Sequence, residues 1–196
     1  MEVDVIITTW GHPSWSGLAQ RVAQPGAAMQ APTHLFHTET EIGGLARNAA
    51  VEAVNPRGWI CFLDADDQLE PGYIDAMSTP LNDDWNYLLT PALRLPGLSP
   101  GFFSERNIID GLNPCPIGTL IHRSVFDAVG QFWGERAWED WSLFRRAVLF
   151  GCTIRFVEGA VYDASNSTRN GRNTVKNPNA LRREIVNSHN VWMGAM

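Results

Sequence analysis

Residues 59–74 read WICFLDADDQLEPGYI, and this stretch decides the fold. Its first five residues are apolar or aromatic without alternation, which is typical of a strand buried on both faces. Three carboxylates follow at once, on Asp64, Asp66 and Asp67. A folded site keeps three carboxylates so close together where a positive charge offsets their repulsion. Mg²⁺ or Mn²⁺ can supply this charge, because both ions bind oxygen ligands such as carboxylates. The alternative is a surface turn in which Asp67 caps the helix after Pro71.

The preceding residues alternate between strand and helix patterns. Strands are expected at 3–9 (VDVIITT) and 33–38 (THLFHT), helices at 14–22 and 45–54, and a loop at 25–32. Strands separated by helices predict a parallel sheet with crossover helices. Ligands of such sheets bind beyond the carboxyl ends of the strands. The acidic cluster after residue 63 lies at that edge.

The second half of the chain predicts the rest of one α/β domain covering residues 1–196. Strands are expected at 87–90, 118–121 and 153–157, and helices at 71–77, 124–129 and 139–150. Residues 95–111 are rich in Pro, Gly and Phe, so we expect a mobile loop there. Residues 178–192 predict a closing helix within a C-terminal segment of 178–196.

Composition narrows the functional classes. The 196 residues are 44% hydrophobic, and no apolar stretch approaches the roughly 20 residues that span a bilayer. Without a signal-peptide pattern at the start, we expect a cytoplasmic protein. The net charge of −6 argues against general nucleic-acid binding.

Three cysteines without CxxC spacing indicate free thiols and no zinc site. A basic group near the C-terminus is either a solvated surface or a phosphate contact: Arg169, Arg172, Lys176, Arg182 and Arg183.

Five segments, taken together, resemble the family 2 glycosyltransferases, which have the GT-A fold. The opening VDVIITTW resembles the first strand of that family, and GGLARNAAVEAV resembles its G-x-x-x-A-R-N helix start. The stretch at 59–74 resembles its D-x-D segment, and PCPIGTLIHRSVFDAVGQF its following strand, helix and G-x-F turn. WEDWSLFRRAVLFG resembles the E-D helix. The resemblance covers residues 3–165 and implies a mixed, mostly parallel central sheet with helices on both faces.

The resemblance implies a role for each matching residue. Thr8, Thr9 and Trp10 would line the nucleoside pocket, with Arg47 and Asn48 near the donor. Arg47 would hold phosphate or orient the acidic loop. Asp64, with Ala65 beside it, would contact ribose or sugar, and Asp66 would be the main ligand of Mn²⁺ or Mg²⁺, assisted by Asp64. On the acceptor side the resemblance names four residues: Asp140 as catalytic base, Glu139 beside it, and Trp138 and Trp141 against the acceptor.

The implied function is transfer of a sugar from a nucleotide-diphosphate donor, with UDP favoured, to a hydroxyl of a glycan, lipid or protein. An inverting reaction suits one base opposite one leaving diphosphate. Glu139 and Asp140 would equally suit the N-terminus of a helix, as cap and dipole complement. Trp133, Trp138 and Trp141 suit both sugar stacking and a core.

Two departures from the family pattern keep alternatives open. His37-Thr38-Glu39 stands where an acidic pair is usual, so Glu39 would have to substitute in reading the base. The family often supplies a late histidine as a further metal ligand, but residues 162–165, which occupy that region, contain none, so Asp163 or His189 would have to replace it. These departures motivate a catalytically inactive nucleotide-sugar or glycan-binding module as the alternative function. A nucleotidyltransferase ranks last, because residues 10–16 contain no Lys or Arg to hold a triphosphate.

Overall fold

The first sheet carries the acidic cluster at its edge. The computed structural model describes residues 2–40, 43–79, 85–135, 137–165 and 177–195. Strands β1 (Val3–Trp10), β2 (Thr33–Thr38) and β3 (Trp59–Leu63) are parallel, and β6 (Ile121–His122) pairs antiparallel with β3. The strand order is β2-β1-β3-β6. The chain therefore moves from β1 to one side and then returns to the other side.

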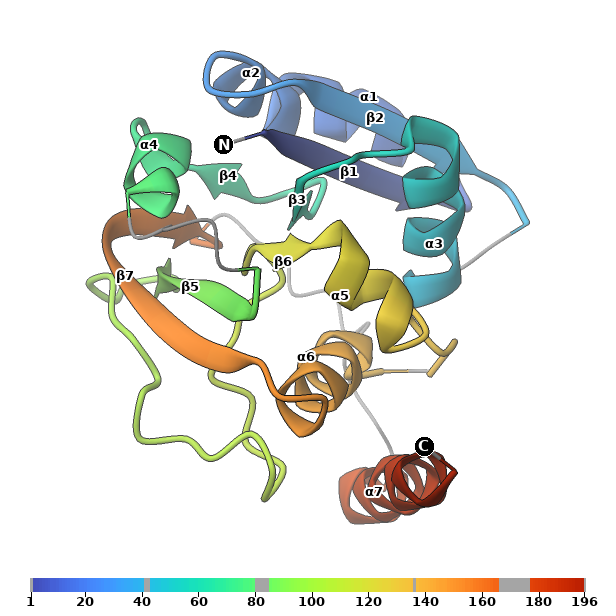
Figure 1. The fold of residues 1–196 in the computed structure, drawn as a ribbon. Coiled ribbons are helices and arrows are strands. Elements are labelled where there is room, and N and C mark those ends of the chain that lie inside the picture. The colour runs from blue at the N-terminus through green and yellow to red at the C-terminus, as the bar shows by residue number, and fades with distance from the viewer. Residues whose placement is uncertain (1, 41–42, 80–84, 136, 166–176, 196) are drawn as a thin grey trace.

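This reversal distributes the crossover helices. Helices α1 (Ser14–Arg21) and α2 (Ala23–Ala28) connect β1 to β2, and α3 (Gly43–Val54) connects β2 to β3 (Figure 1). Right-handed crossovers that run in opposite directions put their helices on opposite faces of the sheet. Residues 3–9 of β1 and all of β3 are consequently buried.

A second sheet continues the first. Its order is β4-β7-β5, from Gln68–Leu69, Thr153–Asp163 and Tyr87–Arg94, and α4 (Tyr73–Ser78) packs against β7. Strands β5 and β7 are parallel, whereas β4 is antiparallel to β7. Leu89 of β5 and Leu120 exchange two backbone hydrogen bonds of 3.2 and 2.9 Å. The segment before β6 thus joins the two sheets.

Three helices complete the domain on the side of β6. They are α5 (Arg123–Ala128), α6 (Glu139–Leu149) and α7 (Pro178–Gly194). Figure 1 shows α7 beside α6, away from the two sheets. No helix in the described ranges combines the length and the apolar surface needed to cross a membrane.

The α/β class with a mostly parallel central sheet is confirmed, and two local predictions are wrong. Residues 25–28 of the loop predicted at 25–32 belong to α2, because Pro25 lies in the first helical turn, where its missing N–H is not needed. The strand predicted at 118–121 shrinks to β6. Residues 116–119 instead form a turn, in which Thr119 N donates to Pro116 O over 2.9 Å. A Cβ on Gly118 would lie 2.2 Å from the Tyr162 ring, so this turn also lets Tyr162 approach β3.

Candidate active site

The candidate site begins where β1 and β3 end side by side. The chain leaves β1 toward β2 on one side and reaches β3 on the other, which makes the gap between β1 and β3 the switch point of the sheet. Open α/β sheets bind ligands at such a point because the following loops diverge there. Trp10 closes β1, and Asp64 follows β3 directly.

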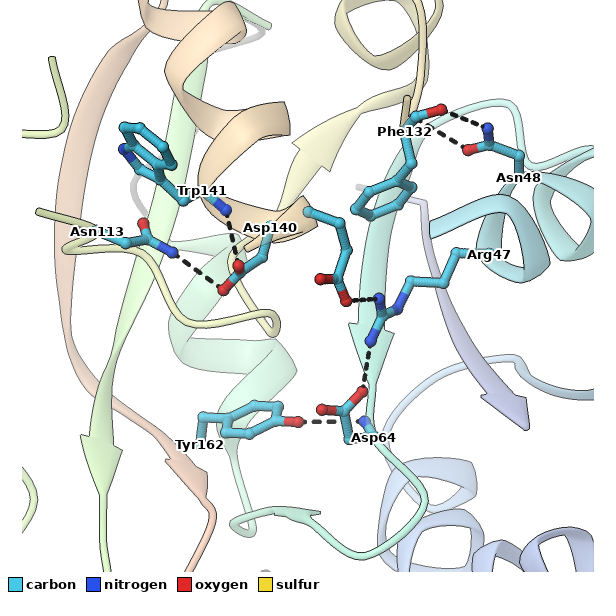
Figure 2. A network of polar contacts seen from close by, with 9 residues as sticks. Arg47, Asn48, Asp64, Asn113, Phe132, Asp140, Trp141 and Tyr162 are labelled. Carbon is cyan, nitrogen blue, oxygen red and sulfur yellow. Dashed lines mark hydrogen bonds and ion pairs between the residues drawn. The ribbon is translucent and has the colours of Figure 1, made fainter. Parts of the chain in front are cut away.

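Arg47 joins the two acidic segments of the chain. Its guanidinium donates to Asp64 Oδ1 over 2.8 Å and to Glu139 Oε1 over 2.7 Å (Figure 2). Burial alone lowers the pKa of this guanidinium, but the two carboxylates outweigh it and raise the pKa above its usual range. The rings of Trp10 and Phe132 flank the group at 5.8 and 5.5 Å. A permanently charged Arg47 therefore holds the loop after β3 against the start of α6.

The acidic loop crowds three carboxyl groups together, and one of them is buried. Tyr162 OH accepts from the backbone N–H of Asp64 over 3.1 Å and also interacts with the carboxylate of Asp67. Asp67 is buried, and its Oδ1 has no hydrogen-bond partner among the described residues. Burial, followed by the charges of Asp64 and Asp66, raises the pKa of Asp67 to about 8. The three carboxyl groups are thus crowded closely enough that Asp67 is mostly protonated at pH 7.

This donor set fits a hard divalent cation that shares its ligands with a substrate. No three His, Cys, Asp or Glu side chains in the described ranges converge as a preformed metal site. Mg²⁺ and similar ions are commonly bound by one or two carboxylates together with substrate phosphates. Asp64 and Asp66 are both partly exposed. They are therefore accessible as ligands, while the buried Asp67 lies behind them and, with its pKa of about 8, is mostly protonated at pH 7.

The start of α6 presents the second acidic pair. Trp138, just before the helix, has a left-handed backbone (φ 61°, ψ 30°), which is uncommon outside glycine and concentrates at functional sites. Asp140 accepts from Trp141 N over 2.7 Å and from Asn113 Nδ2 over 3.0 Å. Burial and then Glu139 raise the pKa of Asp140 to about 7, against the lowering effects of the Trp141 N–H and Arg47. A carboxyl with such a pKa exchanges protons near neutrality.

A pocket of about 440 Å³ opens directly onto Asp140. The segment between β5 and β6 forms one wall and the start of α6 another. Trp141 lines it, although its indole N–H is already satisfied by Ile108 O at 2.9 Å, so this residue serves the core as well. The charged and amide side chains of the lining are Arg106, Asn113 and Asp140. Most of the other lining side chains are apolar or aromatic: Leu93, Phe103, Leu112, Pro116, Trp138 and Trp141. Its size and composition suit a small organic ligand.

The ends of β1 and β2 offer two further polar atoms. Thr9 Oγ1 lies 2.9 Å from His37 Nδ1, in the register that pairs these residues across the strands. The buried Thr8 Oγ1 and His37 Nε2 have no hydrogen-bond partner in the part of the chain that the structure describes. Glu39 follows β2 and is exposed. His37, rather than Glu39, is therefore the side chain held against β1.

A family model matches most of the segments that carry this arrangement. The model of the family described as Glycosyl transferase family 2 matches residues 19–149, which is more than half of the chain. The chain belongs to glycosyl transferase family 2. No protein of curated function matches the sequence of this glycosyltransferase-family chain.

Solved structures show that this family 2 chain has the GT-A fold. S. aureus TarS 1-349 aligns with a TM-score of 0.59 at 16% identity, over 83% of this chain and 60% of TarS 1-349. The same protein in complex with UDP-GlcNAc gives 0.60 at 15% identity, over 84% and 58% of the two chains. GalNAc-T7 with UDP, GalNAc and Mn²⁺ gives 0.56 at 12%, over 83% and 43%. The present chain spans about 60% or less of the length of these proteins.

Several predicted residues of the glycosyltransferase domain have contacts that the sequence did not suggest. Asn48 donates to Phe132 O over 2.8 Å and accepts from Phe132 N over 3.0 Å, so its amide clamps α3 to the segment before α6. Asp163 pairs with Arg94 at 3.1 Å. His189 is fully buried, with both ring nitrogens in contact with residues of α6, so it is not available to a metal.

The sequence analysis missed two residues of the candidate site, and other residues that it named lie apart from this site. Tyr162 and Asn113 carry no motif, and only their contacts with Asp64 and Asp140 reveal them. Cys61, Cys115 and Cys152 are free, as predicted, and all three are buried. Of the basic C-terminal group, Arg169, Arg172 and Lys176 lie outside the described residues. Arg182 packs on Gly111 beside the pocket, and Arg183 is exposed.

Proposed function

We propose that this domain transfers a sugar from a nucleotide-diphosphate donor to an acceptor hydroxyl, with inversion and with the help of Mn²⁺ or Mg²⁺. One observation carries the proposal: Arg47 binds Asp64 and Glu139 at once. The D-x-D loop and the start of α6 are thereby held together beside a pocket that contains Asp140. A group for the leaving diphosphate and a base for the acceptor are the two requirements of the reaction.

Asp140 is assigned as the general base. The ionised carboxylate takes the proton of the acceptor hydroxyl as that oxygen forms a bond to the anomeric carbon. On the opposite side of the sugar, the bond from that carbon to the diphosphate oxygen breaks, and the electron pair leaves with the diphosphate. The pKa of about 7 suits this task, because a base works best near the operating pH. Attack opposite to the leaving group inverts the anomeric centre.

Asp66 and Asp64 are assigned to the divalent ion and the donor. A bound Mn²⁺ or Mg²⁺ stabilises negative charge on a leaving diphosphate. Arg47 keeps Asp64 in place, and Ala65 is buried between the two carboxylates. Thr8, Thr9 and Trp10 are assigned to the nucleoside at the end of β1, with Glu39 or His37 at the base. The bound UDP and UDP-GlcNAc of TarS structures favour a UDP-sugar.

The acceptor is assigned to the pocket that Trp138 and Trp141 line. Aromatic rings stack on the apolar faces of sugars, and Asn113 and Arg106 add polar contacts. We further propose that residues 1–196 fold as a single domain, since the segment before β6 joins the two sheets and α7 packs on α6.

A thermal-shift screen of UDP-, GDP- and TDP-sugars, with and without Mn²⁺, tests the proposal. A ligand at 100 times its Kd stabilises the folded state by about 2.7 kcal/mol, or roughly 5 to 10 °C for a domain of this size. We expect a shift with one nucleotide class that requires the metal and is lost in Asp66→Ala. Asp75→Ala, on the exposed face of α4, is the control. No shift with any donor would contradict the proposal.

Turnover separates the proposed enzyme from a binding module. Release of the nucleoside diphosphate with an acceptor panel supports transfer. A metal-dependent thermal shift without hydrolysis or transfer would support the catalytically inactive alternative instead.

A further inference from the structure

Asn113 stands between the pocket wall and the proposed base. Its Nδ2 donates to Asp140 Oδ2 over 3.0 Å, and its Oδ1 accepts from the backbone N–H of Cys115 over 3.0 Å. The two contacts fix which way the amide points, because a carboxylate needs the NH₂ end and a backbone N–H needs the oxygen. Figure 2 shows Asn113 directed at Asp140 from a segment separate from α6.

The carboxylate of Asp140 is consequently held at both oxygens. Oδ1 accepts from Trp141 N over 2.7 Å, within its own helix, and Oδ2 accepts from Asn113. Two donors from two different segments restrict rotation of the carboxylate about its Cβ–Cγ bond. Each carboxylate oxygen accepts more than one hydrogen bond, so an acceptor hydroxyl can still bind at Oδ2.

The same amide belongs to the wall of the pocket. Arg106 donates to Asn113 O over 3.1 Å, and its guanidinium lies 3.9 Å from the centre of the Phe103 ring. All three residues line the pocket with Asp140. A shift of this wall would therefore move the carboxylate of Asp140 through the side chain of Asn113.

We infer that Asn113 is a positioning residue, which aims Oδ2 of Asp140 into the pocket and favours its ionised form. The inference rests on the proposed function, in which Asp140 is the base. An N–H donor favours the charged form of a carboxylate. It acts with Arg47 of α3 and the Trp141 N–H, against Glu139 on α6 and Asp64 after β3.

Asn113→Asp separates the positioning role from a merely structural one. The substituted side chain has nearly the same shape and keeps an oxygen for Cys115 N, but it replaces the donor to Asp140 with a like charge. We expect the acid limb of the pH profile of kcat to move up by about one unit and kcat at pH 7 to fall about fivefold, because the ionised fraction of the base falls from about one half to about one tenth. The KM for the donor should change less than about twofold, since the lost contact acts on the base and not on donor binding.

Asn107→Asp is a matched control from the same segment between β5 and β6, at a residue that does not line the pocket. Asn107 Oδ1 accepts from Ile109 N over 2.9 Å and its Nδ2 donates to Asp110 Oδ2 over 2.7 Å. The geometry repeats that of Asn113, but the carboxylate is exposed. We expect this variant to keep the kcat and the pH profile of the natural protein.

Asn113→Ser provides a second, uncharged test if the aspartate variant does not fold. A serine hydroxyl keeps a turn contact with the N–H two residues on, but it is too short to reach Asp140. We expect kcat to fall several-fold, with a smaller shift of the acid limb. A folded Asn113→Asp or Asn113→Ser protein with unchanged kcat and pH profile would overturn the inference.

Asp140→Asn distinguishes failure of this inference from failure of the proposed function. Full transfer by Asp140→Asn would show that Asp140 is not the base. That result would overturn both the base assignment and the inference about Asn113. An inactive Asp140→Asn beside fully active Asn113 variants would overturn only the role of Asn113.

Discussion

Helix α6 carries two polar clusters, one at its start and one along its buried side. At the start, Glu139 and Asp140 meet the acidic loop after β3, and Arg47 is the cation that binds both segments. Along the buried side, Arg145 and Arg146 contact neutral acceptors. Arg146 donates to two backbone carbonyls and stacks 4.0 Å from Trp133, and Arg145 donates to His189 Nδ1 over 2.7 Å.

The two clusters differ in how their ionisable groups are paired and in whether those groups reach the pocket. In the buried cluster the hydrogen bonds run as a chain from Arg145 through His189 and Ser142 to Glu135. Because Nδ1 of His189 accepts from Arg145, Nε2 carries its proton and donates to Ser142. Each cluster contains buried polar atoms without a hydrogen-bond partner among the described residues: Asp67 Oδ1 in the acidic cluster, and Glu135 Oε2 and Arg146 Nε in the buried one. The acidic cluster has in addition two carboxyl groups with raised pKa values, and one of them, Asp140, lines the pocket. We therefore expect ligands at the first cluster and a purely structural role for the second.

The largest expected effect comes from Asp140→Asn in the acidic cluster. The amide cannot take the proton of the acceptor, so kcat should fall about a thousandfold, within the range for loss of a general base. Steady-state transfer assays measure it, with Asp75→Asn as the exposed control. The unfolding free energy should stay the same or rise, since a carboxylate that burial disfavours is removed. Retained turnover would show that the two clusters do not differ in function.

Arg146→Met should have the next largest effect, and on stability alone. The guanidinium is fully buried, and its loss leaves the carbonyls of Val129 and Gln131 without their donor. We expect the unfolding free energy to fall by about 3 kcal/mol in urea titrations. Arg57→Met, at an exposed position, is the control. Unchanged stability would contradict the structural role of the buried cluster.

His189 should make the folded state sensitive to acid. Burial, followed by Arg146 and Arg145, lowers the pKa of His189 to about 3. Between that value and the unfolded pKa of about 6.5 the unfolded chain binds the extra proton, so stability falls as the pH is lowered through this window. The loss should reach about 2 to 3 kcal/mol at pH 4.5.

Chemical denaturation at pH 7 and pH 4.5 measures this loss. His189→Gln should flatten the dependence, whereas His12→Gln, at an exposed position, should leave it unchanged. An equal acid slope in His189→Gln would assign the effect to other groups.

The smallest effect is the pH dependence of the reaction itself. The base acts when ionised, and the pKa of Asp140 is about 7, so kcat/KM should fall about tenfold for each pH unit below that value. Profiles at saturating Mn²⁺ or Mg²⁺ check this. An acid limb near the ordinary carboxyl value of about 4 would mean that α6 does not perturb Asp140, or that another group is the base.

Local patterns were sufficient for much of the fold. Short stretches of sequence were enough to recognise the apolar runs of β1 and β3, the length of α6 and the carboxylates after β3. Strand burial and helix periodicity leave patterns within a few consecutive residues, so no knowledge of spatial neighbours was needed. They predicted the α/β class and the edge at which the acidic loop lies. The proposed role of Asp140 came instead from the resemblance to the glycosyltransferase family, because an acidic pair at a helix start is by itself equally consistent with a cap.

Only the tertiary structure brought the parts of the site together. Arg47 lies 17 positions from Asp64 and 92 from Glu139, and Asn113 lies 27 positions from Asp140. No periodicity relates residues so far apart, because their contact depends on where each crossover returns the chain to the sheet. The sequence by itself determined which residues carry charge and which strands are buried. The packing of α3, α6 and the pocket wall decided which charges meet, since side-chain contacts follow from the positions of whole elements.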